Sequence, residues 1–352
     1  MMTADTDNPL FGRTLNPNNP SLTAGGSTGG EGALIALRGS LLGAGTDIGG
    51  SVRIPALCNG IYGFKPTSSR TPFAGKTPPG RIGTPSPILP SIGPEAHSVN
   101  DLELFMKTVI DAEPWIFDET SLNVPWREVQ IPEKSLRLGR ILEDNHRPLH
   151  PTMMRTMMEA ENRLREAGHI IVPLNDLKIY EATTLAWSYF YLDPQKTPVK
   201  HVMKSGEPWV KSISTVLPPE LQGLSIDLDK LWDMNVERRK VLKMYHDTII
   251  KYQLDAILMP PYQATAVPHD TYGFPMYTVL ANMLDWPAGV IPFLQANKKL
   301  DEPYIRKDIK YEPPCKKLLD KTMNIKLTVI RRSRASGGSA EWNSANWKAD
   351  ER

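Results

Sequence analysis

The sequence predicts an α/β protein in which a central β-sheet lies between helical layers. From residue 98 onward, apolar segments of strand length alternate with amphipathic helices, and shorter apolar segments between glycine-rich turns precede that point. Of the 352 residues, 40% are hydrophobic and 23% are charged, which is typical of a globular protein with a substantial core. This composition excludes a disordered or fibrous chain.

The first quarter of the chain alternates glycine-rich turns with short apolar segments. Residues 25–32 form a loop by composition, residues 33–38 predict a short helix, and residues 41–46 predict a strand that runs into a glycine turn. Residues 67–94 are crowded with proline, glycine and serine. We expect that stretch to be a surface loop without long regular elements.

Helices and strands alternate regularly after this loop. Ser98 is a candidate N-cap for a helix over residues 98–111, because a serine hydroxyl accepts a hydrogen bond from a free N–H group of the first turn. The other expected elements are helices over residues 151–166 and 228–252 and strands over residues 136–142, 169–174 and 255–259.

The end of the chain has a different composition. The apolar periodicity fades from about residue 315, and residues 331–352 are basic and rich in serine and alanine. We therefore expect one domain over residues 1–314 and a divergent basic tail over residues 315–352 that is poorly ordered.

Charge and cysteine content exclude several classes of function. The 41 basic and 39 acidic side chains give a net charge of +2, so the chain is not suited to neutralise a nucleic-acid backbone. Two cysteines, Cys58 and Cys315, exclude a multi-bridge disulfide framework and a four-cysteine metal site. We expect no metal and no cofactor.

The sequence also predicts a cytoplasmic location. No apolar run is long enough for a membrane span, and residues 1–9 lack the apolar core of a signal peptide. The sequence gives no indication of the oligomeric state.

The strongest chemical signal is a pair of serines in glycine-rich turns. Ser27 lies in the run Gly-Gly-Ser-Thr-Gly-Gly-Glu-Gly, and Ser51 ends the run Gly-Thr-Asp-Ile-Gly-Gly-Ser. Glycines let the backbone approach a substrate closely, so that consecutive N–H groups converge on one atom. Donors placed in this way stabilise developing negative charge, and the loss of one costs about 3–4 kcal/mol. The two loops predict a serine-based site with an oxyanion cradle.

Two phosphate-binding motifs fail in this region. Gly43 and Gly45 begin a dinucleotide fingerprint, but its third glycine would fall at Ile48. The phosphate-binding loop requires a lysine after its second glycine, and the first lysine of the chain is Lys65.

A third motif remains open as a second hypothesis. Residues 25–29 fit the G-x-S-x-G nucleophile elbow, with Ser27 as the nucleophile of an α/β-hydrolase-like esterase. The elbow should follow an apolar strand, whereas residues 16–24 are rich in proline and asparagine. Such an enzyme would need an acid and one of four histidines: His169, His201, His246 or His269.

The run over residues 25–66 resembles the amidase signature family. The family pattern is a G-G-S-[ST]-G-G box followed by G-T-D-x-[GA]-G-S-[VI]-R-x-P, and residues 14–17, 62–67 and 277–290 are similar to further segments of it. The resemblance covers about residues 6–312 and is strongest to the fungal acetamidase branch, with fatty-acid amide hydrolases more distant. It implies the amidase signature fold, a mixed sheet covered by helices on both faces, and hydrolysis of a small-molecule carboxylic amide.

The resemblance also implies roles for individual residues. By motif position, Ser51 matches the nucleophile that forms the acyl-enzyme, and Ser27 matches the proton-shuttling serine that follows a cis peptide bond from Gly26. The implied oxyanion donors are the N–H groups of Ile48, Gly49, Gly50 and Ser51, and the implied supporting residues are Thr28, Asp47 and Arg53.

One family residue has no counterpart in this sequence. The family uses a lysine several dozen residues before the shuttling serine, and none of the 26 residues before Ser27 is a lysine. Arg13 cannot accept a proton because a guanidinium stays protonated, and we expect Lys65 to have a structural role. We therefore expect this chain to hydrolyse simple amides weakly or not at all, and a non-catalytic protein that retains the pocket is a third hypothesis. The sequence leaves the identity of the amide open, because the apolar residues of its middle part predict core: Trp187, Tyr189 and Phe190.

Overall fold

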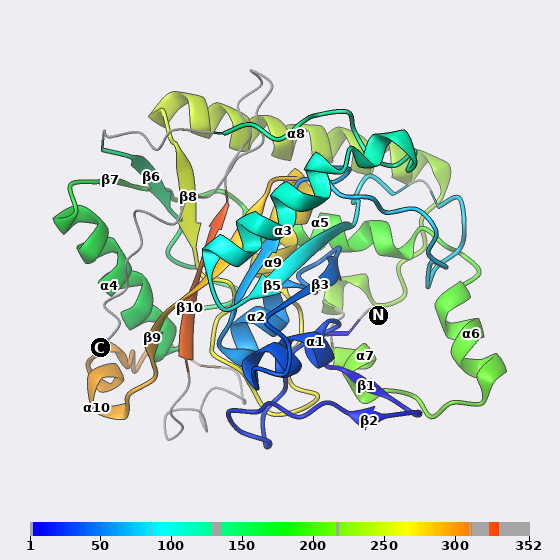
Figure 1. Cartoon of the computed structure of the whole chain (residues 1–352), viewed down its shortest axis with the longest axis horizontal. Helices are drawn as coiled ribbons and strands as arrows, with labels where there is room; N and C mark the ends of the chain where they lie inside the picture. Colours follow the sequence, from blue (N-terminus) through cyan, green and yellow to red (C-terminus); the bar gives the residue numbers. More distant parts are fainter. Residues whose placement is uncertain are drawn as a thin grey trace.

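A mixed sheet forms the centre of the fold, and its strand order brings distant parts of the chain side by side (Figure 1). The computed structural model describes residues 3–84, 86–128, 135–215, 218–309, 311 and 324–330. Within these residues, eight strands pair in the order β3-β5-β4-β9-β10-β8-β6-β7. The pairs from β3 to β8 are antiparallel, whereas β6 is parallel to both β8 and β7. The strand bounds are β3 Leu42–Asp47, β4 Tyr62–Lys65, β5 Ser91–Ala96, β6 Arg137–Arg140, β7 Ile170–Pro173, β8 Ala256–Met259, β9 Ala288–Gln295 and β10 Asn324–Ile330.

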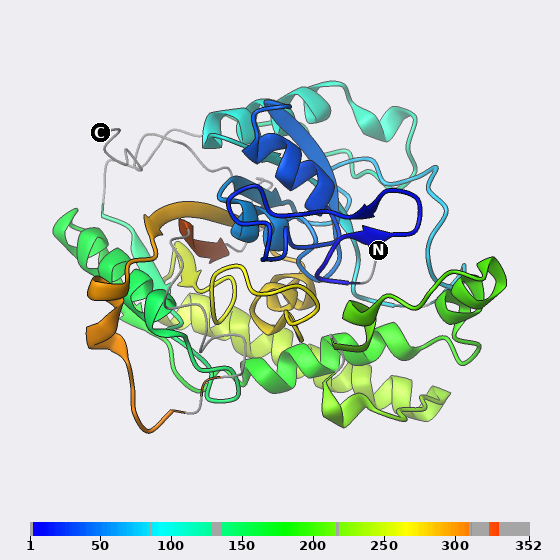
Figure 2. The ribbon, with the colours of Figure 1, turned by 90° about the horizontal axis from the view of Figure 1, so that it is seen from below.

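Helices lie on both sides of this sheet. Figure 2 shows α3 on one side of the molecule and α5 and α8 on the opposite side, with β8 and β9 between them. This arrangement confirms the α/β fold that the sequence predicts. The helix bounds are α1 Gly29–Ala36, α2 Arg53–Asn59, α3 Val99–Asp111, α4 Pro151–Glu166, α5 Ile179–Ser188, α6 Thr197–Ser205, α7 Lys211–Thr215, α8 Leu228–Tyr252, α9 Met276–Leu284 and α10 Lys298–Asp301, with 3-10 turns at Pro114–Ile116, Tyr189–Tyr191, Pro219–Leu221 and Glu302–Tyr304.

Three helices begin where local chemistry predicts. The hydroxyl of Ser98 accepts a hydrogen bond from the Asp101 N–H at 3.1 Å and caps α3. Helix α4 begins with Pro151, which needs no hydrogen-bond donor in the first turn, and ends before Gly168, which has a φ of 85°. Asp227 caps α8 by accepting from the Lys230 N–H at 2.8 Å. The expected bounds of α4 and α8 are confirmed.

Two elements in the first third of the chain differ from the expectation. Helix α1 begins at Gly29 rather than at residue 33 and ends at Ala36, so half of it lies in what composition indicates is a loop. Strand β5 begins at Ser91, inside the loop expected over residues 67–94. A Cβ at Gly93 would overlap the carbonyl oxygen of Phe64, so this glycine permits close strand pairing rather than a turn.

The expectation of a poorly ordered tail is wrong for Asn324–Ile330. This segment forms β10, which pairs with β9 on one edge and β8 on the other and so joins the two halves of the sheet. Its sequence alternates polar and apolar residues, the period of a strand, within a basic stretch. The expected domain boundary at residue 314 therefore omits a central strand, and residues 331–352 lie outside the described residues.

The fold also contains a short hairpin near the start of the chain and a fully buried helix. Strands β1 (Asp7–Asn8) and β2 (Gly12–Arg13) form a separate two-stranded ladder near the start of the chain. Every residue of α9 is buried, as is every residue of β8.

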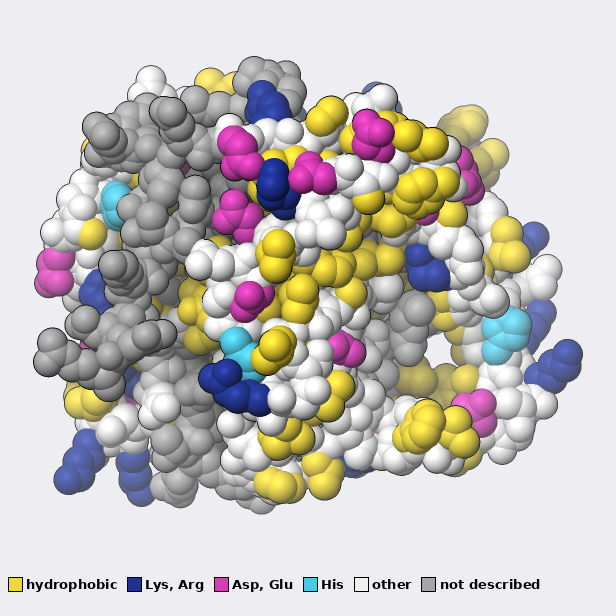
Figure 3. All heavy atoms as spheres, viewed as in Figure 1, with side chains coloured by type: hydrophobic (Ala, Val, Ile, Leu, Met, Phe, Trp, Pro, Cys, Tyr) yellow, Lys and Arg dark blue, Asp and Glu magenta, His cyan; other side chains and the backbone are white. Residues whose placement is uncertain are grey.

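No helix in the described part of the chain is long and apolar enough to cross a membrane. Figure 3 shows acidic and basic side chains interspersed on one face, with apolar side chains between them.

Candidate active site

The two serine-bearing loops are joined to each other. Ser27 lies just before α1, and Ser51 lies between β3 and α2. The Thr28 N–H, next to Ser27, donates a hydrogen bond to the Ser51 carbonyl oxygen with an N···O distance of 3.2 Å. Both serines are half-buried. The structure therefore places side by side two turns that a helix and a strand separate in the sequence.

Glycines allow this close approach. The peptide bond between Gly26 and Ser27 is cis. A Cβ at Gly45 would lie 2.5 Å from the Thr28 hydroxyl oxygen, so β3 and the Ser27 loop pack with no space for a side chain. Gly50 has a φ of 130°, a conformation that residues with a side chain rarely adopt. Gly50 thus has the positive φ that we expect of glycines in these turns, whereas Gly45 serves packing between two protein segments.

A buried ion pair anchors the loop that carries Ser51. Arg53 and Asp47 are fully buried, and the guanidinium donates two hydrogen bonds of 2.9 Å to the carboxylate. The same guanidinium donates to the Thr278 carbonyl and to the Asn282 side-chain oxygen of α9, each at 2.7 Å. The pair therefore ties the loop between β3 and α2 to a helix more than 200 residues away in the sequence.

The charge state of Asp47 follows from these contacts. Burial opposes ionisation, but the adjacent Arg53 guanidinium outweighs it, and the pKa of Asp47 lies below its ordinary value. Asn282 contributes to the same direction by donating from its amide nitrogen at 3.1 Å. Asp47 is thus a carboxylate that can accept hydrogen bonds from the loop it anchors.

Asp47 and Thr278 set the orientation of the peptide groups in this loop. The Gly50 N–H donates to the Asp47 carboxylate at 2.8 Å, and the Thr278 hydroxyl donates to the Gly49 carbonyl at 2.7 Å. The Gly50 N–H is therefore engaged inside the loop. The oxyanion cradle that the sequence suggests over Ile48, Gly49, Gly50 and Ser51 stays a prediction, and the Gly50 N–H is the one of its donors that we find hydrogen-bonded to the Asp47 carboxylate.

Lys65 lies at the end of β4 and is fully buried. Its ammonium donates to the Pro66 carbonyl at 2.8 Å and lies 4.0 Å from a carboxylate oxygen of Asp285. Burial lowers the pKa of Lys65 to about 8, with Asp285 opposing that shift. These contacts link the lysine to the segment that follows β4 and to the residue after α9. They fit the structural role that we expect for it.

Comparison with known proteins identifies the family. A family model described as Amidase matches residues 1–310. The chain belongs to the amidase signature family. It is 37% identical over 307 residues to an amidase of Gibberella moniliformis and 35% identical over 314 residues to an acetamidase of Aspergillus oryzae, with 86% of this chain and 57% of each relative covered. A solved fatty acid amide hydrolase superposes with a TM-score of 0.85 at 29% identity, covering 94% of this chain and 60% of that one.

The matches are partial in length. The chain spans a little over half the length of the curated amidases that it resembles. These comparisons confirm the resemblance that the motifs indicate and the fold that it implies.

Trp187 is a residue of this amidase fold whose place the sequence did not reveal. It is half-buried on α5, and a Cβ at Gly49 would lie 3.3 Å from its indole ring. Phe190 and Phe274 pack edge-on against the indole with ring centroids 5.1 and 5.5 Å away. The sequence predicts all three of Trp187, Tyr189 and Phe190 as core residues. Tyr189 is buried in the core, whereas Trp187 and Phe190 are half-buried against it and Trp187 also borders the Ser51 loop.

The histidine candidates make contacts of their own. The Nε2 atom of His269 lies 3.0 Å from the Pro20 carbonyl oxygen, and its Nδ1 atom lies 3.6 Å from the Asp5 carboxylate. His169 accepts from the Leu136 N–H at 3.3 Å. No group of three or more His, Cys, Asp or Glu side chains in the described segments could hold a metal ion.

Proposed function

We propose that this chain carries the two-serine centre of an amide hydrolase, with Ser51 as the nucleophile. The observation that carries the proposal is the hydrogen bond from the Thr28 N–H to the Ser51 carbonyl, which holds the two serine loops together. The family assignment and the buried Asp47–Arg53 pair behind the Ser51 loop support it. The domain that bears this centre extends to at least Ile330, because β10 completes its sheet.

The reaction proceeds through a covalent intermediate. The Ser51 hydroxyl oxygen attacks the amide carbonyl carbon as its proton passes to the Ser27 oxygen and the Ser27 proton passes to a water molecule. The negative charge on the former carbonyl oxygen is held by N–H groups. Ser27 returns a proton to the nitrogen as the carbon–nitrogen bond breaks, which releases the amine or ammonia. Water then attacks the acyl-enzyme and releases the acid. We assign the oxyanion donors to Ile48, Gly49 and Ser51, since the Gly50 N–H is bonded to Asp47.

Three residues support the reacting groups without touching the substrate. Asp47 and Arg53 fix the loop between β3 and α2, and Thr28 joins the two loops through its backbone. We infer a small amide as the substrate, because the Aspergillus oryzae relative is an acetamidase and the Trp187 ring borders the Ser51 loop.

Turnover by the 352-residue chain is expected to be slow. Ser27 needs a partner that takes up its proton, and a neutral lysine is the group that does so in the family. No lysine precedes Lys65 in the sequence. The side-chain ammonium of Lys65 donates its hydrogen bond to the Pro66 carbonyl oxygen. In a preparation of these 352 residues, the proposed nucleophile and shuttle are therefore expected to work without the lysine that the family uses as their base.

Hydrolysis assays test this proposal. Purified chain is incubated with acetamide and with an aromatic amide, and the release of ammonia or amine is followed for the wild type, Ser51→Ala, Ser27→Ala and Ser205→Ala. Ser205 is an exposed serine at the end of α6, so its variant controls for loss of any serine. We expect slow hydrolysis that Ser51→Ala and Ser27→Ala abolish and Ser205→Ala retains. Hydrolysis that survives Ser51→Ala would overturn the assignment of the nucleophile.

The assays also separate the alternatives. An esterase that uses Ser27 with a histidine would lose activity on replacement of that histidine, whereas the two-serine centre is indifferent to it. A rate equal to that of a full-length amidase, abolished by Ser51→Ala, would confirm the nucleophile and contradict the expected slow turnover. Complete absence of reaction at Ser51 would favour a non-catalytic protein.

A further inference from the structure

The Thr6 hydroxyl lies inside the loop that carries Ser27. Its oxygen accepts a hydrogen bond from the Gly29 N–H at 3.0 Å and lies 3.0 Å from the Gly25 carbonyl oxygen and 3.2 Å from the Ser27 carbonyl oxygen. A hydroxyl has one proton to donate and two lone pairs, so it donates to one of these carbonyls or is shared between them. One side chain thus contacts the loop before, at and after Ser27.

Glycines in the Ser27 loop fit this segment closely. A Cβ at Gly29 would lie 2.5 Å from the Thr6 hydroxyl oxygen. A Cβ at Gly26 would lie 2.5 Å from the Asp5 carbonyl oxygen and 2.6 Å from the Thr3 carbonyl oxygen. Backbone cannot shift out of the way as a flexible side chain does. The glycines on each side of Ser27 are therefore matched to residues 3–6, which lie against the loop.

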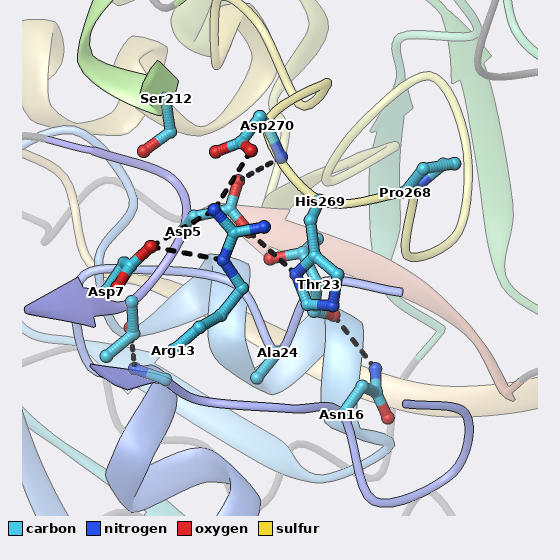
Figure 4. Close-up of polar contacts among 12 residues, drawn as sticks. Asp5, Asp7, Arg13, Asn16, Thr23, Ala24, Ser212, Pro268, His269 and Asp270 are labelled. Atoms are coloured by element: carbon cyan, nitrogen blue, oxygen red, sulfur yellow. Dashed lines mark hydrogen bonds and ion pairs between the residues drawn. The ribbon is translucent and has the colours of Figure 1, made fainter. Parts of the chain in front are cut away.

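The segment that carries Thr6 is itself held in place. Arg13 forms ion pairs with Asp7 at 3.1 Å and with Asp270 at 3.0 Å, and Figure 4 shows its guanidinium reaching between these two carboxylates. The buried Asp5 carboxylate accepts from the Asp270 N–H at 3.0 Å. These contacts fix the backbone on each side of Thr6 to the loop at residues 268–270, so the Thr6 hydroxyl is presented from a rigid support.

We propose that Thr6 is a positioning residue whose hydroxyl fixes the conformation of the Gly25–Gly29 loop and thereby the place of Ser27. It acts through the backbone of the loop and does not contact the substrate. The positioning role in catalysis rests on the proposed function, whereas the effect on the loop does not.

Hydrogen exchange tests the effect on the loop. The variant Thr6→Val keeps the shape of the side chain and removes the hydroxyl, and Thr6→Ser keeps the hydroxyl. Thr248→Val is the matched control, because the Thr248 hydroxyl donates to the Met244 carbonyl at 2.8 Å within α8. In Thr6→Val we expect the Gly29 amide to exchange about tenfold faster, since its acceptor is lost. Thr6→Ser and Thr248→Val should exchange there at the wild-type rate.

Two outcomes of this experiment would overturn the proposal. The first is wild-type exchange of the loop amides in Thr6→Val. The second is faster exchange in Thr6→Ser, which would make the methyl group rather than the hydroxyl the important contact. Far-ultraviolet circular dichroism and the melting temperature identify a variant that fails to fold, and in that case Thr6→Ser carries the comparison.

The rate at which a fluorophosphonate labels Ser51 tests the role in catalysis. We expect Thr6→Val to lower the maximal labelling rate about tenfold with little change in the concentration for half-maximal rate, and Thr6→Ser to restore it. Faster loop exchange with an unchanged labelling rate would show that Thr6 holds the loop but does not position Ser27. No labelling in the wild type would contradict the proposed function, and the exchange result would still decide the effect of Thr6 on the loop.

Discussion

Replacing Arg53 by methionine tests the anchor of the Ser51 loop most sharply. The substitution keeps an apolar stem of similar length and removes the guanidinium. Four hydrogen bonds are lost: two to Asp47, one to the Thr278 carbonyl and one to the Asn282 side chain. The Asp47 carboxylate then stays fully buried without its counter-ion.

The expected loss of stability follows from that stranded charge. Hydrogen bonds to charged groups contribute about 1.5–3 kcal/mol each, but summing four of them ignores the hydration that Arg53 and Asp47 lose on burial. Removing one partner of a buried pair costs about 3–5 kcal/mol, because the other charge is left uncompensated. Total folding stabilities are only about 5–15 kcal/mol, so the variant should be severely destabilised.

Urea unfolding at pH 7 measures this loss. We expect Arg53→Met to lower the free energy of unfolding by about 3–5 kcal/mol. The double variant Asp47→Asn/Arg53→Met should lose less than the sum of the two single variants, because the stranded charge is absent. Lys243→Met is the control: Lys243 pairs with Asp247 at the surface, with side chains 74% and 54% exposed, and its loss should cost at most about 1 kcal/mol.

The pH dependence gives a second check. The pKa of Asp47 lies below its ordinary value in the folded protein, so the stabilisation is present above the unfolded-state pKa of about 3.9. It is lost as the pH falls through the lowered folded-state pKa. The difference between wild type and Arg53→Met should therefore shrink on acidification. A loss below about 1 kcal/mol at pH 7, or strict additivity with Asp47→Asn, would refute the reasoning.

Three further predictions concern other parts of the chain. Burial lowers the pKa of Lys65 to about 8, so between pH 8 and 10.5 the unfolded chain binds a proton that the folded chain does not. Over that range the wild type should therefore gain up to about 3 kcal/mol of stability relative to Lys65→Met. A difference in the free energy of unfolding in urea that does not change with pH would contradict this. Trp187→Ala should open space beside Gly49 and raise the rate at which long-chain fluorophosphonates label Ser51 relative to short-chain ones. The control Tyr189→Phe should leave that ratio of rates unchanged. Ser98→Ala should remove the N-cap of α3 and cost about 1 kcal/mol by thermal unfolding, and an unchanged melting temperature would exclude that contribution.

Local signals explain which elements the sequence predicts well. Helices α4 and α8 have a proline or an aspartate at the start and a regular apolar period. Their hydrogen bonds join residues that are close in sequence, so the local sequence is enough to predict them. Strand β10 was missed because its pairing partners, β8 and β9, end 65 and 29 residues before it begins and its own stretch is basic. Gly93 in β5 has the composition of a turn but packs against the Phe64 carbonyl of another strand.

The residues of the candidate site also fall into two groups, those that the sequence motifs mark and those that only the fold brings to the site. The motifs brought attention to Ser27, Ser51 and the Asp47–Arg53 pair because these residues lie within two short runs of sequence. Thr6 and Trp187 contact those runs only through the fold, and nothing in their own neighbourhood marks them. Thr278 lies in a segment that resembles the family, but its contact with Gly49 is visible only in the fold. The engagement of the Gly50 N–H with Asp47 is a matter of backbone orientation, which a motif does not specify.

Peptide mapping by mass spectrometry after treatment with a fluorophosphonate examines the central claim most directly. The folded wild-type chain should gain a single covalent adduct, at Ser51. The same adduct should form more slowly in Ser27→Ala, and it should not form when the chain is unfolded in urea. An adduct at Ser27 alone, or modification of several serines at similar rates, would contradict the claim that the two loops form one centre with Ser51 as its nucleophile.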